Sequence, residues 1–351
     1  MLCSLNEYVI IPATISYISS RSECNIRDEY GKLPLFAAPM SSVIDDTNYK
    51  VFERLGVNTV IPRTVNLDKR LELMTQVFCA FNLDEFEKYF LEINRAEERF
   101  KVCVDVANGH MERLISMCST AKDKYRNRLI LMTGNIANPK TYSVYARANI
   151  DYVRIGIGSG NVCTTAANTG VHFPMGSLLD AITKEKEALN FTECKHRPKI
   201  IADGGFTNFD QINKAFALGA DYVMIGKLFA ECEEACGEIY NEFKAHDRWT
   251  EEDKKHLVFN EKSGTYMTRI RYYYGMSTKQ AQAQMGKTEL KTAEGIEKIV
   301  YVKYTLESWL SNFSAYLRSA MSYTDCTTLE EFKTKVKLEK ITPTAFKSYF
   351  K

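Results

Sequence analysis

Residues 199–227 read KIIADGGFTNFDQINKAFALGADYVMIGK, an apolar run, an amphipathic stretch and a second apolar run. Both apolar runs are rich in aliphatic residues and lead into glycine, as buried strands do where a loop follows. The stretch FDQINKAFALG, which begins at 209, has the apolar spacing of a helix that lies on a sheet. The segment therefore predicts strand, helix, strand, the repeating unit of a parallel α/β fold.

Similar apolar runs recur along the chain, with amphipathic stretches such as LDEFEKYFLEI from 83 between them. The eight runs are PLFAAP near 34, NTVIP near 58, QVFCAF near 76, KVCVDVA from 101, RLILMTG from 128, DYVRIGIG from 151, KIIADGG from 199 and DYVMIGK from 221. Their hydrophobicity is continuous, which suits strands that are buried on both faces. Eight such units favour a closed (β/α)8 TIM barrel, whose functional residues lie on loops at the C-terminal ends of the strands.

The chain beyond residue 228 exceeds what a bare barrel needs. It contains a charged stretch near 229–256 that we expect to be helical, a tyrosine-rich turn RYYYGMS at 271–277, and a C-terminal helix around 305–320. No linker, low-complexity tract or internal repeat separates this part from the rest. We therefore predict one catalytic domain over 1–351, with a C-terminal extension packed on the barrel and no inserted regulatory repeats.

Composition excludes several classes of function. The chain has 46 basic and 44 acidic residues, a formal charge of +2, so it lacks the basic surface of a nucleic-acid-binding protein. No apolar run is long enough for a membrane helix, and the N-terminus has no signal-peptide layout. The ten cysteines contain no CxxC pair, which favours a reduced, cytoplasmic protein. Cys232 and Cys236 are spaced for one face of a helix, where packing is a better interpretation than metal binding.

Cys163 is the most informative residue of the chain. It lies in GSGNVCTT, residues 158–165, directly after the sixth predicted strand. Glycines there allow a ligand to approach the backbone, and a thiol at this place lies at the barrel mouth. Most of the other nine cysteines are better explained as small buried hydrophobic residues. For Cys163 we predict nucleophilic chemistry, which needs surroundings that stabilise a thiolate.

The last two predicted strands end in ADGG, 202–205, and MIGK, 224–227. In many barrels this corner binds phosphate through backbone amides. Asp203 would then be placed to bind ribose hydroxyl groups. The alternative is that these glycines only form tight turns and that Asp203 caps a helix.

Five ordered segments now identify a resemblance. VCVDVANGH, TGNIANP, VRIGIGSGNVCTTAANTGV, IIADGGFTNFDQINKAFALGADYVMIGKLFA and YYGMS resemble the signature of the GMP reductase and IMP dehydrogenase family, over most of the chain from SRSE near 20 to EGIE near 294. The resemblance implies that Cys163 attacks C2 of a purine nucleotide and forms a covalent thioimidate intermediate. It implies that Thr165 and Glu294 handle the proton transfers that release the 2-amino group as ammonia.

The resemblance also assigns the binding residues. The 5′-phosphate would be enclosed by Gly160, Asn161, Gly204, Gly205, Gly226, Lys227 and Tyr274, the ribose held by Asp203, and the base contacted by Met40, Gly275 and Met276. Without the resemblance, core packing would be the better interpretation of Met40 and Met276. Asp105 and Asn135 would face a nicotinamide cofactor. A monovalent cation at Gly158, Gly160 and Cys163 and a homotetramer are further expectations.

The reductase branch of the family is favoured over the dehydrogenase branch. Dehydrogenases commonly carry an inserted pair of regulatory repeats and an Arg-Tyr pair that activates water, and STKQAQAQMGKTELKTAE, 277–294, contains no such pair. The favoured function is NADPH-dependent deamination of GMP to IMP. IMP dehydrogenase, a reductase of a modified or deoxy purine nucleotide, and a regulatory barrel that only binds purine nucleotides are the alternatives.

Several positions depart from the reductase pattern. Ala166 stands where an arginine is usual, Leu290-Lys291 where Tyr-Arg is usual, HFPM at 172–175 replaces GYPQ, and Lys227 replaces the second glycine of the phosphate loop. The stretch between MIGK and YYGMS is also long and charged. These changes cluster around the predicted ligand, which keeps the modified or deoxy substrate open.

Overall fold

A closed barrel of eight parallel strands forms the centre of the computed structural model, which describes residues 2–244, 248–286, 292 and 294–349. The barrel strands are β2 (Leu35–Ala37), β3 (Asn58–Ile61), β4 (Phe78–Phe81), β5 (Phe100–Asp105), β6 (Leu129–Ile136), β7 (Tyr152–Ile155), β8 (Lys199–Asp203) and β9 (Tyr222–Ile225). They pair in chain order, and β9 closes the ring by pairing with β2. All eight predicted strands and the (β/α)8 TIM barrel are thereby confirmed.

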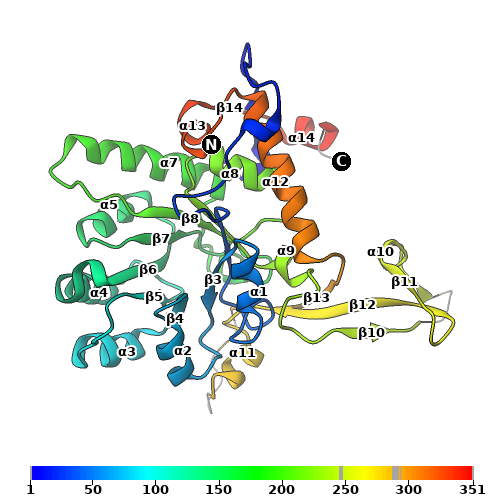
Figure 1. Ribbon diagram of the computed structural model, residues 1–351, viewed down its shortest axis with the longest axis horizontal. Coiled ribbons are helices and arrows are strands. Elements are labelled where there is room, and N and C mark those ends of the chain that lie inside the picture. The colour runs from blue at the N-terminus through cyan, green and yellow to red at the C-terminus, as the bar shows by residue number, and fades with distance from the viewer. Residues whose placement is uncertain (1, 245–247, 287–291, 293, 350–351) are drawn as a thin grey trace.

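Helices surround the barrel on the outside (Figure 1). They are α1 (Tyr49–Arg54), α2 (Leu67–Leu73), α3 (Leu83–Phe86), which continues as a π-helical turn over Glu87–Glu92, α4 (Glu112–Tyr125), α5 (Pro139–Arg147), α7 (Met175–Ala188) and α8 (Phe209–Ala217). The two amphipathic stretches singled out in the sequence are α3 with its extension and α8. A short helix, α6 (Thr165–Thr169), interrupts the loop between β7 and α7.

Burial on both faces explains the continuous hydrophobicity of the strands. In β2, Phe36 points into the barrel and packs with interior residues such as Met132 and Met224. Its neighbours Leu35 and Ala37 point outward and belong to the core between barrel and helices. Successive side chains alternate between two buried faces. Apolar residues are therefore favoured at every position of the strand.

An aromatic cluster fills the N-terminal mouth of the barrel. Phe36, Phe78, Tyr152 and Tyr222 contact one another with ring centroids 5.2–6.1 Å apart, mostly edge to face. The hydroxyl group of Tyr222 donates to Asp28 Oδ2 at 3.0 Å. The interior is therefore packed at this end, and the room for a ligand lies at the opposite, C-terminal mouth.

The C-terminal extension packs on the barrel, as predicted. Helix α12 (Leu306–Tyr323) places Trp309 against Phe209 of α8 and against Phe229, with ring centroids 5.1 Å apart in both pairs. The remaining elements are α13 (Leu329–Lys335), β14 (Lys337–Lys340), α14 (Pro343–Tyr349) and β1 (Tyr8–Ile11), which pairs antiparallel with β14. Within the described residues, no helix is both long enough and apolar enough to cross a membrane.

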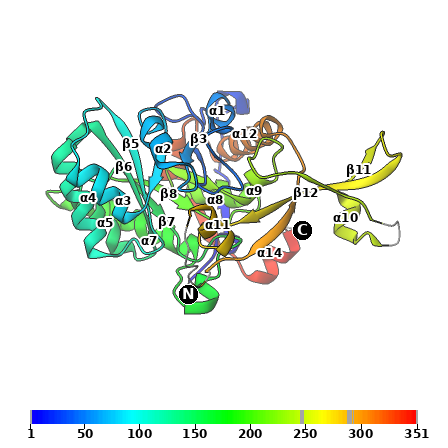
Figure 2. The ribbon, with the colours of Figure 1, turned by 90° about the horizontal axis from the view of Figure 1, so that it is seen from below.

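A sheet of four strands extends from the side of the barrel, and both views show it as an arm (Figures 1 and 2). The arm contains β10 (Tyr240–Glu242), α10 (Glu251–Lys255), β11 (Leu257–Asn260), β12 (Thr265–Tyr274) and β13 (Glu297–Tyr301). The predicted helix over 229–256 is therefore wrong, apart from the end of α9 (Lys227–Ala230) and the short α10. The predicted turn RYYYGMS is wrong as well, because its first four residues end β12. Long-range pairing with β12 overrides the local preference for helix.

Arg271 of β12 fastens the arm to the loop that follows α9. Its side chain is 1% exposed, and its guanidinium donates at 2.5–3.3 Å to the carbonyl groups of Ala230, Cys232, Glu233, Ala235 and Gly237. Cys232 and Cys236 lie in this loop and not on a helix, so helix packing is not the explanation of their spacing. Cys236 Sγ donates to the carbonyl oxygen of Ser41 at 3.0 Å. The carbonyl-rich turn around Arg271 sets the position of both thiols.

Candidate active site

A cavity of about 430 Å³ opens at the C-terminal mouth of the barrel. Its walls are loops that follow β2, β3, β5, β6, β7, β8 and β9, together with the segments around residues 275 and 294. The predicted site residues that line it are Met40, Asp105, Asn135, Gly158, Gly160, Asn161, Cys163, Thr165, Asp203, Gly204, Gly205, Gly226, Lys227, Gly275, Met276 and Glu294. Of the predicted site residues, only Tyr274 is absent from the walls.

Glycines allow the loop after β7 to lie against the loop after β8. Gly205 has a φ of +88°, and a Cβ atom there would lie 2.8 Å from the carbonyl oxygen of Ser159. Gly158 has a φ of +71°, and its Cβ would lie 2.6 Å from the Cβ of Ala166. A side chain at Gly205 would push the two loops apart, and one at Gly158 would collide with Ala166 within the loop after β7, so these glycines fix the place of Cys163.

Cys163, Thr165 and Glu294 form a chain of hydrogen bonds at the cavity wall. Cys163 Sγ donates to Thr165 Oγ1 at 3.3 Å, and Thr165 Oγ1 donates to Glu294 Oε2 at 2.7 Å. The backbone holds the two segments together, because Thr164 N donates to the carbonyl oxygen of Glu294 and Ile296 N to that of Val162. A thiol, a hydroxyl and a carboxylate in series can move a proton between the sulfur and the carboxylate.

The surroundings of Cys163 differ from those of the other cysteines. It is half-buried and is the only one of the ten cysteines that lines this cavity. By contrast, Cys103 lies inside the barrel, where burial raises the pKa of its thiol to about 12. A buried thiol of that kind stays protonated and unreactive at neutral pH. The structure thus sets Cys163 apart from the other nine cysteines, as the sequence suggested.

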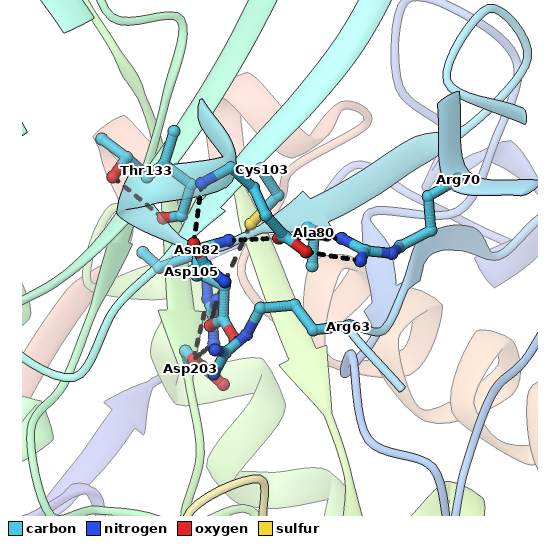
Figure 3. Close-up of polar contacts among 11 residues, drawn as sticks. Arg63, Arg70, Ala80, Asn82, Cys103, Asp105, Thr133 and Asp203 are labelled. Carbon is cyan, nitrogen blue, oxygen red and sulfur yellow. Dashed lines mark hydrogen bonds and ion pairs between the residues drawn. The ribbon is translucent and has the colours of Figure 1, made fainter. Parts of the chain in front are cut away.

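Two arginines and two aspartates form a buried ion-pair network beneath the cavity. Arg154 of β7 donates through Nη2 to Asp203 at 2.8 Å and through Nη1 to Asp105 at 2.7 Å. Arg63, which follows β3, donates through Nε to the other oxygen of Asp105 at 3.0 Å. Figure 3 shows the side chains of Arg63, Asp105 and Asp203 gathered at this point. The network joins the residue predicted to hold ribose to a residue predicted to face the cofactor.

Charge pairing in this network outweighs desolvation. Burial alone would raise the pKa of Asp105, but the charges of Arg63 and Arg154 hold it below its ordinary value. Burial alone would likewise lower the pKa of Arg154, whereas Asp203 and Asp105 raise it above its already high value. Asp105 and Arg154 therefore stay ionised at neutral pH, and the attraction between them fixes their orientation.

Asn135 connects β6 to the same network. Its side-chain amide donates to Asp203 Oδ2 at 2.8 Å and to the carbonyl oxygen of Gly156 at 2.9 Å. Arg154 and Asn135 both donate to the Asp203 carboxylate, and all of these hydrogen bonds are accepted by Oδ2. Within the described residues, Asp203 Oδ1 and Asn135 Oδ1 have no hydrogen-bond partner. Both acceptors remain available to a ligand in the cavity.

Lys227 brings a positive charge to the corner formed by the ends of β8 and β9. Its ammonium group pairs with Glu231, which is 3% exposed. Glu231 also pairs with Lys303 at 3.4 Å and accepts from the hydroxyl group of Tyr304 at 2.9 Å. Lys227 is thus held at the cavity wall by a buried carboxylate, next to the backbone of Gly226.

Tyr273, and not Tyr274, is the tyrosine of the cavity wall. Tyr274 is buried on the other face of β12, where its hydroxyl group contacts Ser41 at 3.5 Å and accepts from Gln284 Nε2 at 3.0 Å. Gln284 ends α11 (Lys279–Gln284). Side chains alternate along a strand, so an error of one residue moves the side chain to the opposite face. Tyr274 therefore does not line the cavity, whereas Tyr273 does, and the predicted contact of Tyr274 with the phosphate stays a prediction.

Comparison with known proteins settles the relationship that the motifs suggested. The family model described as IMP dehydrogenase / GMP reductase domain matches residues 93–349, more than half of the chain. The chain belongs to this family. The resemblance found in the sequence is confirmed, and so is the prediction of an oxidoreductase of the GMP reductase type.

Individual members of the IMP dehydrogenase / GMP reductase family are distant in sequence. A GMP reductase of Buchnera aphidicola is 25% identical over 95% of this chain and 93% of its own length. GMP reductase 1 of Homo sapiens is 25% identical over 91% of this chain and 86% of its own length. An inosine-5′-monophosphate dehydrogenase of Chlorobaculum parvum is 31% identical, but over 69% of this chain and 45% of its own length.

Departures from the family pattern lie beside the cavity. Ala166 packs against the Gly158 loop, and His172 Nδ1 forms a hydrogen bond of 2.7 Å with the carbonyl oxygen of Ile157. Leu290 and Lys291 lie outside the described residues. Among the residues that are described, no group of three or more His, Cys, Asp or Glu side chains could hold a metal ion. The predicted cation at Gly158, Gly160 and Cys163 involves other atoms and stays a prediction.

Sequence reasoning missed three residues of the site: Arg63, Arg154 and Tyr273. Arg154 gave a signal, because it is the only charged residue in the apolar run YVRIGIG of a barrel strand. Arg63 gave a weaker one, since it follows the end of β3, where barrel enzymes place functional residues. Nothing in the sequence distinguishes Tyr273 from Tyr274, because the strand register decides which of them faces the cavity.

Proposed function

We propose that this protein catalyses the NADPH-dependent reductive deamination of GMP to IMP and ammonia through a covalent intermediate on Cys163. One observation carries the proposal: the hydrogen-bonded series Cys163–Thr165–Glu294 lies in the wall of the main cavity. A protein that only binds nucleotides needs none of these three groups. Family membership supports the same reaction class.

Cys163 is the nucleophile in this proposal. Its proton passes toward Thr165 and Glu294, and the sulfur forms a bond to C2 of the guanine base. The bond from C2 to the 2-amino group breaks, and the amino group leaves as ammonia after it has gained a proton. The product of this half-reaction is a thioimidate, so one difficult displacement is divided into two easier steps.

Thr165 and Glu294 serve as the proton relay. Thr165 Oγ1 lies between the sulfur and the carboxylate, 3.3 Å from one and 2.7 Å from the other. It can accept a proton from one side while it donates to the other. The backbone pairing of 162–164 with 294–296 keeps these distances short, which is the positioning that proton transfer requires.

The walls of the cavity fit a nucleoside monophosphate. Gly160, Gly204 and Gly226 expose backbone near Lys227, which suits a phosphate group. Asp203 Oδ1, which has no hydrogen-bond partner among the described residues, would accept from ribose hydroxyl groups. Met40, Gly275 and Met276 would contact the base.

The side of the cavity near Asp105 fits a nicotinamide cofactor. Asn135 Oδ1 has no partner within the described residues and can accept from a carboxamide. Arg63 uses only Nε in its ion pair with Asp105, which leaves its terminal nitrogens for an anionic cofactor. When bound, NADPH would supply a hydride to C2, which allows the thiolate of Cys163 to leave.

The reaction can be tested with GMP and NADPH by following loss of absorbance of the reduced cofactor and release of ammonia. Cys163→Ala should lower turnover by at least about 10³-fold. Cys194→Ala is the matched control, since Cys194 is also half-buried but lies outside the cavity, and it should retain activity. Full activity of Cys163→Ala would refute the nucleophile.

A substrate panel distinguishes the remaining alternatives. Reduction of NAD⁺ with IMP would indicate the dehydrogenase reaction. This alternative is tested because a dehydrogenase of the family is 31% identical to the chain. If deoxy or modified purine nucleotides are turned over faster than GMP, they and not GMP are the substrate. Binding without turnover across the panel would indicate a regulatory barrel. We further propose that residues 1–351 act as one catalytic unit in a homotetramer, which light scattering would measure.

A further inference from the structure

A second cavity, of about 950 Å³, lies at the N-terminal mouth of the barrel, opposite the candidate active site. We call it the N-terminal groove. It is lined by Glu29, Tyr30, Glu98, Arg99, Lys122, Lys124, Tyr125, Arg126, Asn127, Arg128, Leu129, Ile130, Asp151, Tyr152, His196, Arg197 and Lys199. The starts of β6, β7 and β8 meet in it. The proposed reaction uses none of these residues.

The groove concentrates positive charge. Seven lysine and arginine side chains line it against three carboxylates. The whole chain has an excess of only two positive charges, so the rest of the protein is slightly acidic. A concave surface with an excess of one sign of charge focuses the electric field and attracts ions of the opposite sign.

Most of these cations have no carboxylate partner. Lys122 pairs with Asp151 at 2.7 Å, and Lys199 lies 3.6 Å from Glu29. Lys124 and Arg128 donate only to backbone carbonyl groups, and so does Arg197 apart from one bond to the side chain of Asn190. Within the described residues, the side chains of Arg99 and Arg126 have no polar partner. In the described part of the chain, five positive charges are thus left without an opposite charge in contact.

Helix dipoles account for only part of this charge. Lys122 and Lys124 lie in the last turn of α4, where cations interact favourably with the C-terminal end of a helix. The other five cations of the groove lie outside α-helices. Their grouping therefore needs a further reason.

Backbone strain points to the same place. Arg126 has a φ of +50° and a ψ of −127°, a backbone conformation that residues other than glycine rarely adopt. Residues held in this way tend to occur where function requires them. The turn at Arg126 joins α4 to β6 and presents this arginine at the groove, next to Arg128.

An aromatic side chain completes the site. Tyr30 is 61% exposed and lies on the turn between Asp28 and Lys32 at the edge of the groove. An exposed ring beside arginines offers a surface on which a nucleobase stacks, while the guanidinium groups bind phosphate oxygens.

From these observations we propose that the N-terminal groove binds a compact polyphosphate anion. Arg99, Arg126 and Arg128 would bind the phosphate oxygens. The chemistry is shared by inorganic polyphosphate and the polyphosphate tail of a nucleotide, and Tyr30 distinguishes the two. This inference does not depend on the proposed reaction, since it concerns the opposite mouth of the barrel.

Calorimetric titration of the full chain with inorganic tripolyphosphate tests the groove. We expect saturable binding that weakens as salt rises, and at least tenfold weaker binding in Arg99→Glu/Arg126→Glu. Arg113→Glu/Lys88→Glu is the matched control, because it makes the same change in net charge with exposed residues outside the groove. It should alter the affinity less than twofold. Thermal melting confirms that each variant is folded.

A parallel titration with ATP identifies the source of the polyphosphate. If a nucleotide is the ligand, Tyr30→Ala weakens binding of ATP at least threefold and leaves tripolyphosphate binding unchanged. Equal effects on both probes assign the site to the polyphosphate alone. Absence of saturable binding of either probe, or equal affinity in the unaltered protein and in the folded Arg99→Glu/Arg126→Glu variant, would overturn the proposal.

Discussion

The two mouths of the barrel both contain arginine, but they use its charge in different ways. At the C-terminal mouth, Arg154 is buried between Asp105 and Asp203, and each charge has an opposite charge in contact. At the N-terminal mouth, Arg99 and Arg126 face the groove without a carboxylate partner in the described part of the chain. Paired charges fix the geometry of a site, whereas unpaired charges leave an electric field for a ligand. The same residue type therefore builds a framework at one end and an attractive surface at the other.

The largest difference between the mouths should appear in catalysis. Glu294→Gln keeps the shape of the side chain but removes the proton acceptor for Thr165, and we expect kcat to fall by about 10²–10⁴-fold. The same change at the N-terminal mouth, Glu98→Gln, should leave kcat within twofold. Steady-state rates with GMP and NADPH measure both. Equal rates for the two variants would remove Glu294 from the relay.

The arginines of the two mouths should also differ in how much they contribute to the stability of the fold. Arg154→Met leaves two carboxylates near a cavity floor without their shared partner, and we expect the free energy of unfolding to fall by about 3–5 kcal/mol. Arg99→Met removes an arginine from the groove and should change it by no more than about 0.5 kcal/mol. Denaturant unfolding of both variants tests this. Similar values would mean that pairing does not distinguish the two ends.

Acid should weaken the ion pairs at the C-terminal mouth of the barrel. The pKa of Asp105 is lowered in the folded protein, since Arg63 and Arg154 overcome the opposing effect of burial. Its ion pairs therefore contribute stability above the unfolded pKa of about 3.9 and lose that contribution as the pH falls through the folded pKa. The difference in unfolding free energy between the unaltered protein and Asp105→Asn should be largest near neutral pH and shrink in acid. A difference that is independent of pH would contradict this account.

The smallest effect is expected at the strained turn of the groove. Arg126→Gly relieves a φ of +50° and should raise the free energy of unfolding by about 1 kcal/mol. Arg99→Gly, at a residue without a positive φ, should give no such gain. If the groove binds polyphosphate, Arg126→Gly should also weaken that binding, so stability and affinity would change in opposite directions. Melting temperatures and calorimetry measure the two effects.

The barrel could be predicted from sequence because its signals are local. Each strand is a short run buried on both faces, such as the run around Phe36, and each run ends at a glycine, proline or polar residue. The arm could not be predicted, because Tyr240–Glu242 and Leu257–Asn260 become strands only by pairing with β12. Charged stretches of this kind look helical until their partner is known.

The candidate site was predictable in its residue types and less so in its geometry. Cys163 and Thr165 follow a barrel strand, but only the family resemblance connected them with Glu294, which lies 129 residues beyond Thr165. The choice between Tyr273 and Tyr274 depends on strand parity, which no local pattern contains. The network around Arg154 depends on which strands become neighbours, so its partners could not be assigned in advance.

The anchoring of Arg271 separates the arm into a fixed base and a free outer part. Its five carbonyl contacts tie the base of β12 to the loop after α9, while Tyr240 and Ile270 mark the last paired position of β10 before the arm leaves the barrel. We therefore expect that the arm beyond that pair can be shortened or lengthened without moving Tyr273 or Gly275. The outer arm is therefore a suitable place to attach a label or a tether.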